Sequence, residues 1–110
     1  MQKEKINFTD AFPAFATELR RLLEEQGELN LGAQVPNLLI LDRCRCGDDI
    51  CGTFYTKPKP IGGFGPGHRN VRLMPEYGML ILDVVAEEIA CVEVLDRNEV
   101  RRQLDEALPM

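Results

Sequence analysis

The chain has 110 residues, the usual size of one domain, so we predict a single domain over residues 1–110. Apolar residues make up 45% and charged residues 28% of the chain, a balance that excludes disordered and collagen-like classes. The formal net charge of −5 argues against nucleic acid as a partner, because an acidic surface repels phosphate backbones.

The first predicted element is an amphipathic helix over residues 8–27. Its apolar residues recur at the spacing of one helical face; they are Phe12, Phe15, Ala16, Leu19, Leu22 and Leu23. Thr9 or Asp10 can cap the start of this helix, and Pro13 is tolerated only in a first turn. Gly27 is a suitable residue just past the C-terminal end.

The middle of the chain predicts five short strands, after a connector that can hold a short helical turn. The predicted strands cover residues 38–46, 50–56, 71–75, 77–85 and 88–95. A loop rich in proline and glycine separates the second strand from the third, and a tight turn near Ala86 joins the last two.

A second helix is predicted over residues 96–108, where Asp96 and Glu99 fit a capping box. The order α-β-β-β-β-β-α predicts an α+β fold, with the N-terminal and C-terminal helices packed on an antiparallel sheet of about five strands. Two helices cover one face of such a sheet. Alternation along the first hairpin then predicts a mixed surface, suited to a homodimer or a protein partner, formed by Leu39, Leu41, Arg43, Arg45, Ile50 and Phe54.

Three of the four cysteines lie in one short stretch, CRCGDDIC, residues 44–51. Cys44 and Cys46 share a strand face if the stretch is regular. A two-residue turn at Gly47 pairs Cys44 with Cys51, whereas a turn at Asp48 pairs Cys46 with Cys51. Both registers place the three sulfur atoms on one face, and a three-residue turn sends Cys51 to the other face.

The expected compartment of the protein bears on the state of these cysteines. No apolar run reaches the roughly 20 residues of a membrane span, and the start MQKEKINFTD lacks the apolar stretch of a secretory signal. We therefore expect a cytoplasmic protein with reduced thiols and no membrane partner.

Three interpretations of the cysteine hairpin stay open. In the first, the cysteines bind zinc, with His68 or Cys91 as fourth ligand. In the second, Cys51 forms a redox couple with a cross-strand cysteine. In the third, all are small core residues without a cofactor.

The segment GGFGPGHR suggests a second candidate site, because consecutive glycines let backbone N–H groups converge on an anion. A strand rather than a helix follows the segment, so it matches no established phosphate-binding motif. The candidate ligand contacts are Gly63, Gly65, Gly67, His68 and Arg69. His68 is the single histidine of the chain, so any imidazole chemistry must use it.

Two acidic residues occur within predicted strands. Asp83 interrupts the apolar run MLILDVV, and a buried carboxylate there needs a partner, for which Arg43, Arg45 or Arg69 is available. Glu93 lies within ACVEVL, and we expect it to face solvent on a one-sided sheet.

Residues 78–104, GMLILDVVAEEIACVEVLDRNEVRRQL, resemble the C-terminal part of small uncharacterised bacterial proteins. The stretch CRCGDDICGTFYT is similar to segments of such proteins as well. The resemblance implies a compact bacterial α+β module and brings no functional residue with it.

These observations favour a non-enzymatic binding or interaction module. The alternatives are a zinc- or thiol-dependent protein that uses Cys44, Cys46, Cys51 and His68, or a small anion-binding enzyme that uses the loop at residues 62–69.

Overall fold

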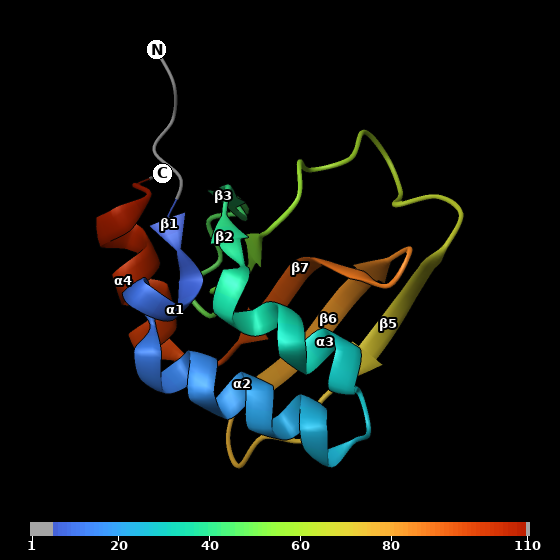
Figure 1. Ribbon diagram of the computed structural model, residues 1–110. Helices are drawn as coiled ribbons and strands as arrows, with labels where there is room; N and C mark the ends of the chain where they lie inside the picture. The colour runs from blue at the N-terminus through green and yellow to red at the C-terminus, as the bar shows by residue number, and fades with distance from the viewer. Residues whose placement is uncertain (1–5, 110) are drawn as a thin grey trace.

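The computed structural model describes residues 6–109 and confirms an α+β fold (Figure 1). Within this range a five-stranded antiparallel sheet has the order β3-β4-β7-β6-β5, and a two-stranded sheet pairs β1 with β2. The helices are α1 Phe8–Ala11, α2 Pro13–Glu25, α3 Leu29–Gln34, the 3-10 helix η1 Val35–Asn37 and α4 Asn98–Ala107. The strands are β1 Ile6–Asn7, β2 Leu39–Ile40, β3 Asp42–Arg43, β4 Phe54–Tyr55, β5 His68–Arg72, β6 Met79–Val85 and β7 Glu88–Leu95.

The predicted N-terminal helix is divided at Phe12, whose ψ of 65° is not helical. Pro13 is the cause, because proline lacks the N–H that a continuous helix would use and starts a helix instead. The expected caps Thr9 and Asp10 were wrong, since the side chain of Asn7 accepts the N–H of Asp10 at 2.8 Å. Gly27 does follow the C-cap, with φ of +80°.

The hairpin of β6 and β7 has the tight turn that the sequence predicts. Ala86 and Glu87 both have positive φ, 51° and 62°, as a two-residue hairpin turn requires. The third strand begins earlier than predicted, because His68 pairs with Val85 at the end of β6. His68 and Arg69 therefore belong to a strand and not to the preceding loop.

One face of the sheet forms the core. The cross-strand row Phe54, Val92, Leu82 and Val71 lies on this face and is buried, and α1, α2, α3 and α4 contribute the opposing apolar side chains. Figure 1 shows α2 and α3 in front of β5, β6 and β7. The described helices thus pack on this face alone, although Asp83 and Cys91 on the opposite face are buried as well.

Two residues of the predicted interaction surface, Arg43 and Phe54, are buried and do not lie on a surface. Arg43 pairs with Phe54 in register, and both side chains lie on the core face. Phe54 is fully buried, and Nη1 of Arg43 binds the carboxylate of Asp105 on α4 at 2.5 Å. Helix α4 covers these residues because it packs over the β3–β4 end of the sheet, where Val100 lies close to the backbone at Gly52.

The start of α4 also differs from the prediction. Asp96 adopts φ of +59°, and the N-cap is Arg97, which makes no side-chain capping hydrogen bond. Asp96 and Glu99 therefore form no capping box. The left-handed residue instead turns the Arg97 side chain inward, where its guanidinium binds Glu18 at 2.6 and 2.7 Å.

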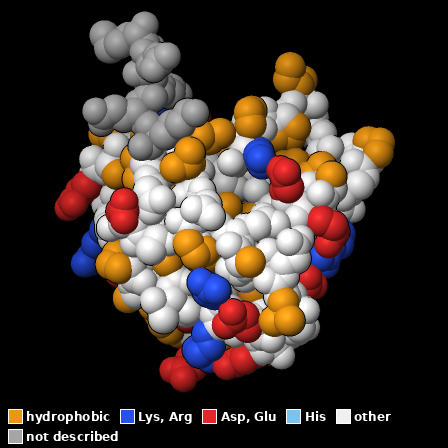
Figure 2. All heavy atoms as spheres, in the orientation of Figure 1, with side chains coloured by type: hydrophobic (Ala, Val, Ile, Leu, Met, Phe, Trp, Pro, Cys, Tyr) orange, Lys and Arg blue, Asp and Glu red, His pale blue; other side chains and the backbone are white. Residues whose placement is uncertain are grey.

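The surface carries charges of both signs. Figure 2 shows basic and acidic side chains alternating on the face where α2 lies, in agreement with the exposed pairs Arg20–Glu24 and Arg21–Glu25. Within residues 6–109, no helix combines the length and apolar character that a membrane crossing requires.

Candidate functional site

The three hairpin cysteines come together. The sulfur atoms of Cys44, Cys46 and Cys51 all lie within 4.8 Å of one another. Cys44 is half-buried beside β3, Cys46 is exposed in the turn, and Cys51 is buried against β7. In the described part of the chain, no other group of three or more His, Cys, Asp or Glu residues is this close.

The strand register explains this convergence. Arg43 pairs with Phe54, and the N–H of Cys44 donates to the carbonyl of Thr53 at 2.8 Å. If this pairing continued along the two segments, Cys46 would lie opposite Cys51. Regular pairing ends there. The tip closes instead through Gly47, whose φ is +78°, and through the carbonyl of Asp48, which accepts the N–H of Cys51.

The thiols differ in acidity. The backbone N–H of Asp48 donates to the sulfur of Cys46 and lowers its pKa, and hydrogen bonds from Cys44 and Cys51 lower it further. Burial is the main cause that raises the pKa of Cys44 to about 11. Cys46 is therefore the first of these two to lose its proton, and the neighbouring thiols donate hydrogen bonds to the thiolate.

The fourth ligands considered from the sequence lie elsewhere. His68 is on β5 and the thiol hairpin is at β3, the opposite edge of the sheet. Four spacings of about 4.8 Å between these strands separate the two edges by roughly 19 Å. Cys91 is buried in β7, in register with Asp83 and Tyr55. Neither residue belongs to the thiol cluster.

A second polar cluster surrounds Asp83 on the face of the sheet opposite the helices. Its side chain is only 7% exposed. Its Oδ1 lies 2.8 Å from Nε2 of His68 and accepts a hydrogen bond from Nδ2 of Asn70 at 2.7 Å. The arginine partners predicted for Asp83 were wrong, because Arg43, Arg45 and Arg69 bind other carboxylates.

Glu93 completes this cluster and is not the solvent-facing residue that the alternation predicts. Its side chain is half-buried and in hydrogen-bonding contact with Asp83. Burial, followed by the nearby carboxylate of Asp83, raises the pKa of Glu93 to about 7. Glu93 keeps its proton to higher pH because a second negative charge beside a carboxylate is costly.

Replacing Glu93 with glutamine should raise stability at pH 8. The native state keeps a proton on Glu93 up to its pKa of about 7, whereas the unfolded chain releases it near the ordinary pKa of 4.5. Stability is thus lost as the pH rises through this window. We expect Glu93→Gln to gain about 1 kcal/mol at pH 8, a figure reduced for partial exposure, and almost nothing at pH 4.

Urea unfolding at both pH values checks this result, with the exposed Glu106→Gln as the control. An equal gain for Glu93→Gln at pH 4 and pH 8 would contradict the raised pKa of Glu93, because a pH-independent gain has another origin.

Two of the candidate residues at the glycine-rich loop, His68 and Arg69, already have side-chain partners in the fold. Arg69 is engaged by Glu28 and Glu87 at 2.9–3.0 Å, contacts that raise its pKa and occupy its guanidinium. Gly65 and Gly67 have φ of +78° and +82°, so they serve to turn the chain. At Gly63 the space that a Cβ atom would occupy has no neighbouring atom within 4 Å. Phe64 instead packs on the ring of His68, with centroids 4.8 Å apart.

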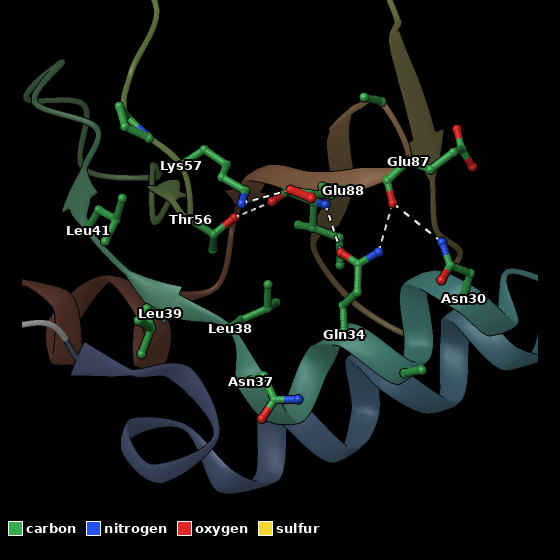
Figure 3. A pocket seen from close by; sticks show the side chains of 14 residues that line it. Asn30, Gln34, Asn37, Leu38, Leu39, Leu41, Thr56, Lys57, Glu87 and Glu88 are labelled. Atoms are coloured by element: carbon green, nitrogen blue, oxygen red, sulfur yellow. Dashed lines mark hydrogen bonds and ion pairs between the residues drawn. The ribbon is translucent and has the colours of Figure 1, made fainter.

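A cavity of about 810 Å³ opens between α3, β2 and the β6–β7 turn (Figure 3). Its polar groups are already joined across it. Gln34 donates to the carbonyl of Glu87 and accepts from the N–H of Ile89, while Lys57 pairs with Glu88 at 2.8 Å. These contacts hold α3 against the hairpin, so the cavity offers few unpaired groups to a ligand.

Comparison of the chain with protein-family models, with curated proteins and with solved structures gives no match. The cysteine spacing pointed to the thiol cluster, but the cluster of Asp83, Glu93, His68 and Asn70 was not predicted. The sequence feature that could have indicated this cluster is the acidic residue inside each of two strongly apolar strands, Asp83 and Glu93. Only the register between the strands brings these residues together with His68 and Asn70.

Proposed function

We propose that this protein binds one zinc ion through the thiolates of Cys44, Cys46 and Cys51. The observation that carries the proposal is the mutual approach of the three sulfur atoms, all within 4.8 Å. Zn–S bonds of about 2.3 Å in a tetrahedral site place the sulfur atoms roughly 3.8 Å apart. A contraction of at most about 1 Å would therefore complete the site, and the exposed turn that carries Cys46 can supply it.

Three protein ligands leave the fourth position of a tetrahedral ion open. In zinc proteins this is the arrangement of sites that exchange a ligand, whereas purely structural sites use four protein ligands. Binding must displace the thiol protons, including that of Cys44, whose pKa is about 11. Affinity should consequently increase with pH.

The test is elemental mass spectrometry on untagged protein purified without chelator, followed by competition titration with zinc and a chromophoric chelator. We expect one zinc per chain. The exposed ligand gives the cleanest variant, and Cys46→Ser should weaken zinc binding on the order of 100-fold, since structural zinc sites release roughly 10–16 kcal/mol over their ligands. The control is Cys91→Ala, which removes the cysteine outside the cluster.

Copper(I) in place of zinc would revise the ion and keep the site. Equal zinc affinity in Cys46→Ser and the unmodified protein would refute the site itself. Unchanged thermal unfolding of metal-free Cys46→Ser shows that any loss of affinity is local.

A further inference from the structure

The three clustered thiols differ in how easily a reagent from solvent reaches them. Cys46 is exposed in the turn, Cys44 is half-buried, and Cys51 is only 8% exposed. A small oxidant therefore meets Cys46 first. Because the three sulfur atoms lie within 4.8 Å of one another, a product formed at Cys46 has a second thiol close by. An accessible cysteine beside a sheltered one is the arrangement of cysteines that oxidise reversibly.

The backbone of the hairpin brings Cys51 to Cys46. The chain reverses between Asp48 and Cys51, where the carbonyl of Asp48 accepts the N–H of Cys51 at 3.2 Å. In the register that Arg43 and Phe54 begin, Cys46 and Cys51 are directly opposite. Opposite residues of antiparallel strands have α-carbons roughly 4.5–5.5 Å apart, within the range of about 4.4–6.8 Å that disulfides span.

Cys44 is less suited as the partner of either cysteine. Its N–H donates to the carbonyl of Thr53 at 2.8 Å, so it lies opposite Thr53 and diagonal to Cys51. Diagonal neighbours are roughly 7–8 Å apart, beyond the disulfide range. Cys44 and Cys46 are two residues apart on one segment, and an extended chain holds such α-carbons about 6.6 Å apart, at the upper end of that range.

The charges at the tip of the hairpin favour an uncharged oxidant. Asp48 and Asp49 are both exposed beside Cys46. The neighbouring basic residue, Arg45, is paired with Asp42 at 2.8 Å. An acidic tip repels anionic reagents such as small disulfides that carry carboxylates, whereas a neutral hydroperoxide approaches without this cost.

We propose that a hydroperoxide oxidises Cys46 and that Cys51 resolves the product, forming a Cys46–Cys51 disulfide that expels the zinc ion. The inference rests on the proposed zinc site and adds its regulation. Only Cys44 of the three ligands remains a free thiol afterwards, which is too few to hold the ion. From at most 4.8 Å, the two sulfur atoms must approach by at most about 2.8 Å to bond, and the exposed turn can supply this movement.

The reaction has two steps. The sulfur of Cys46 attacks one peroxide oxygen, so that an S–O bond forms, the O–O bond breaks, and the leaving oxygen takes the thiol proton to become an alcohol or water. The sulfur of Cys51 then attacks the sulfenic acid, an S–S bond forms, and the oxygen leaves as water with the proton of Cys51. The cysteine pair loses two electrons and the peroxide gains them. With zinc bound the thiolates carry no protons, and solvent supplies both.

The test treats the full chain with hydrogen peroxide in two preparations, one metal-free and one loaded with zinc. The metal-free protein should lose about 2 Da, the mass of two hydrogens, and peptide mapping should place the new bond between Cys46 and Cys51. The loaded protein should release its zinc to a chromophoric chelator as this mass change develops. Dithiothreitol should then restore both the mass and zinc binding.

Three variants identify the pair. Cys44→Ser should still lose about 2 Da, since Cys46 and Cys51 remain. Cys51→Ser should not, and its sulfenic acid at Cys46 should be captured by dimedone. Cys91→Ala is the control, because Cys91 is buried in β7 outside the cluster, and it should oxidise as the unmodified protein does. Circular dichroism verifies that each variant is folded.

The two preparations separate this inference from the zinc site itself. A metal-free protein that forms the disulfide but never binds zinc would refute the zinc site and leave the oxidation in place. Zinc binding without a mass loss in the metal-free protein would overturn the inference alone. Zinc retained by the oxidised protein, or an undiminished mass loss in folded Cys51→Ser, would overturn it as well.

Discussion

Replacing Glu18 with glutamine should lower the free energy of unfolding by about 3 kcal/mol, the lower end of the cost of removing one partner from a buried ion pair. The side chain of Arg97 is 1% exposed, and both of its terminal nitrogens bind the carboxylate of Glu18 at 2.6 and 2.7 Å. The guanidinium also lies over the rings of Tyr77 and Phe15, at 4.2 and 5.3 Å. Glutamine preserves the shape and leaves this charge buried without compensation.

Urea unfolding at pH 7 measures the effect, and Glu24→Gln provides the control because its pair with Arg20 is 47% exposed on both sides. An exposed pair of this kind contributes about 0.5 kcal/mol or less. The hydrogen bond from Arg97 lowers the pKa of Glu18, so the difference between Glu18→Gln and the unmodified protein should be full above pH 4.5 and shrink as the pH falls through the lowered value. Equal losses for the two variants would show that burial adds nothing to this pair.

Replacing Gly78 with alanine should cost about 3 kcal/mol, from two causes that add. Gly78 has φ of +71°, a conformation that costs an L-residue roughly 1–2 kcal/mol. A Cβ atom would also lie 2.8 Å from the carbonyl oxygen of Leu95 and 2.8 Å from Cγ of Arg97. Overpacking of this kind adds about 1–3 kcal/mol, because the backbone oxygen cannot move without disturbing β7.

Gly62→Ala separates these two causes. Gly62 has φ of +79°, yet a Cβ atom added there would meet nothing within 4 Å. It should therefore cost only the conformational part, about 1 kcal/mol. If both alanine variants unfold at the same urea concentration, the close approach of β7 to Gly78 contributes nothing to the loss in the free energy of unfolding.

The fold class could be predicted because its determinants are local. The apolar stripe of Phe15, Leu19 and Leu23 defines a helix face, and the alternating residues on either side of Ala86 define a hairpin. The errors arise where local signals compete. Pro13 divided one helix into two, and the close packing of Arg97 displaced the capping box that Asp96 suggests.

The candidate sites show the same division. Cys44, Cys46 and Cys51 are joined by one short hairpin, so their spacing alone pointed to the cluster. His68 is separated from Asp83 by only 15 residues, but their contact depends on the register of β5 with β6, which no local pattern specifies. The partner of a buried acidic residue was therefore assigned to arginines, each of which binds another carboxylate.

The strand order β3-β4-β7-β6-β5 has a consequence for how the two side-chain clusters relate energetically. The thiol hairpin extends from the edge strand β3, whereas His68, Asn70 and Asp83 lie on β5 and β6. Energetic coupling between two sites requires an element with two arrangements that both sites bias. Here the paired strands β4 and β7 lie between the two clusters and share one close-packed core. Zinc at the hairpin should therefore leave the Asp83 cluster unchanged, and either cluster can be altered by substitution without a change in the other.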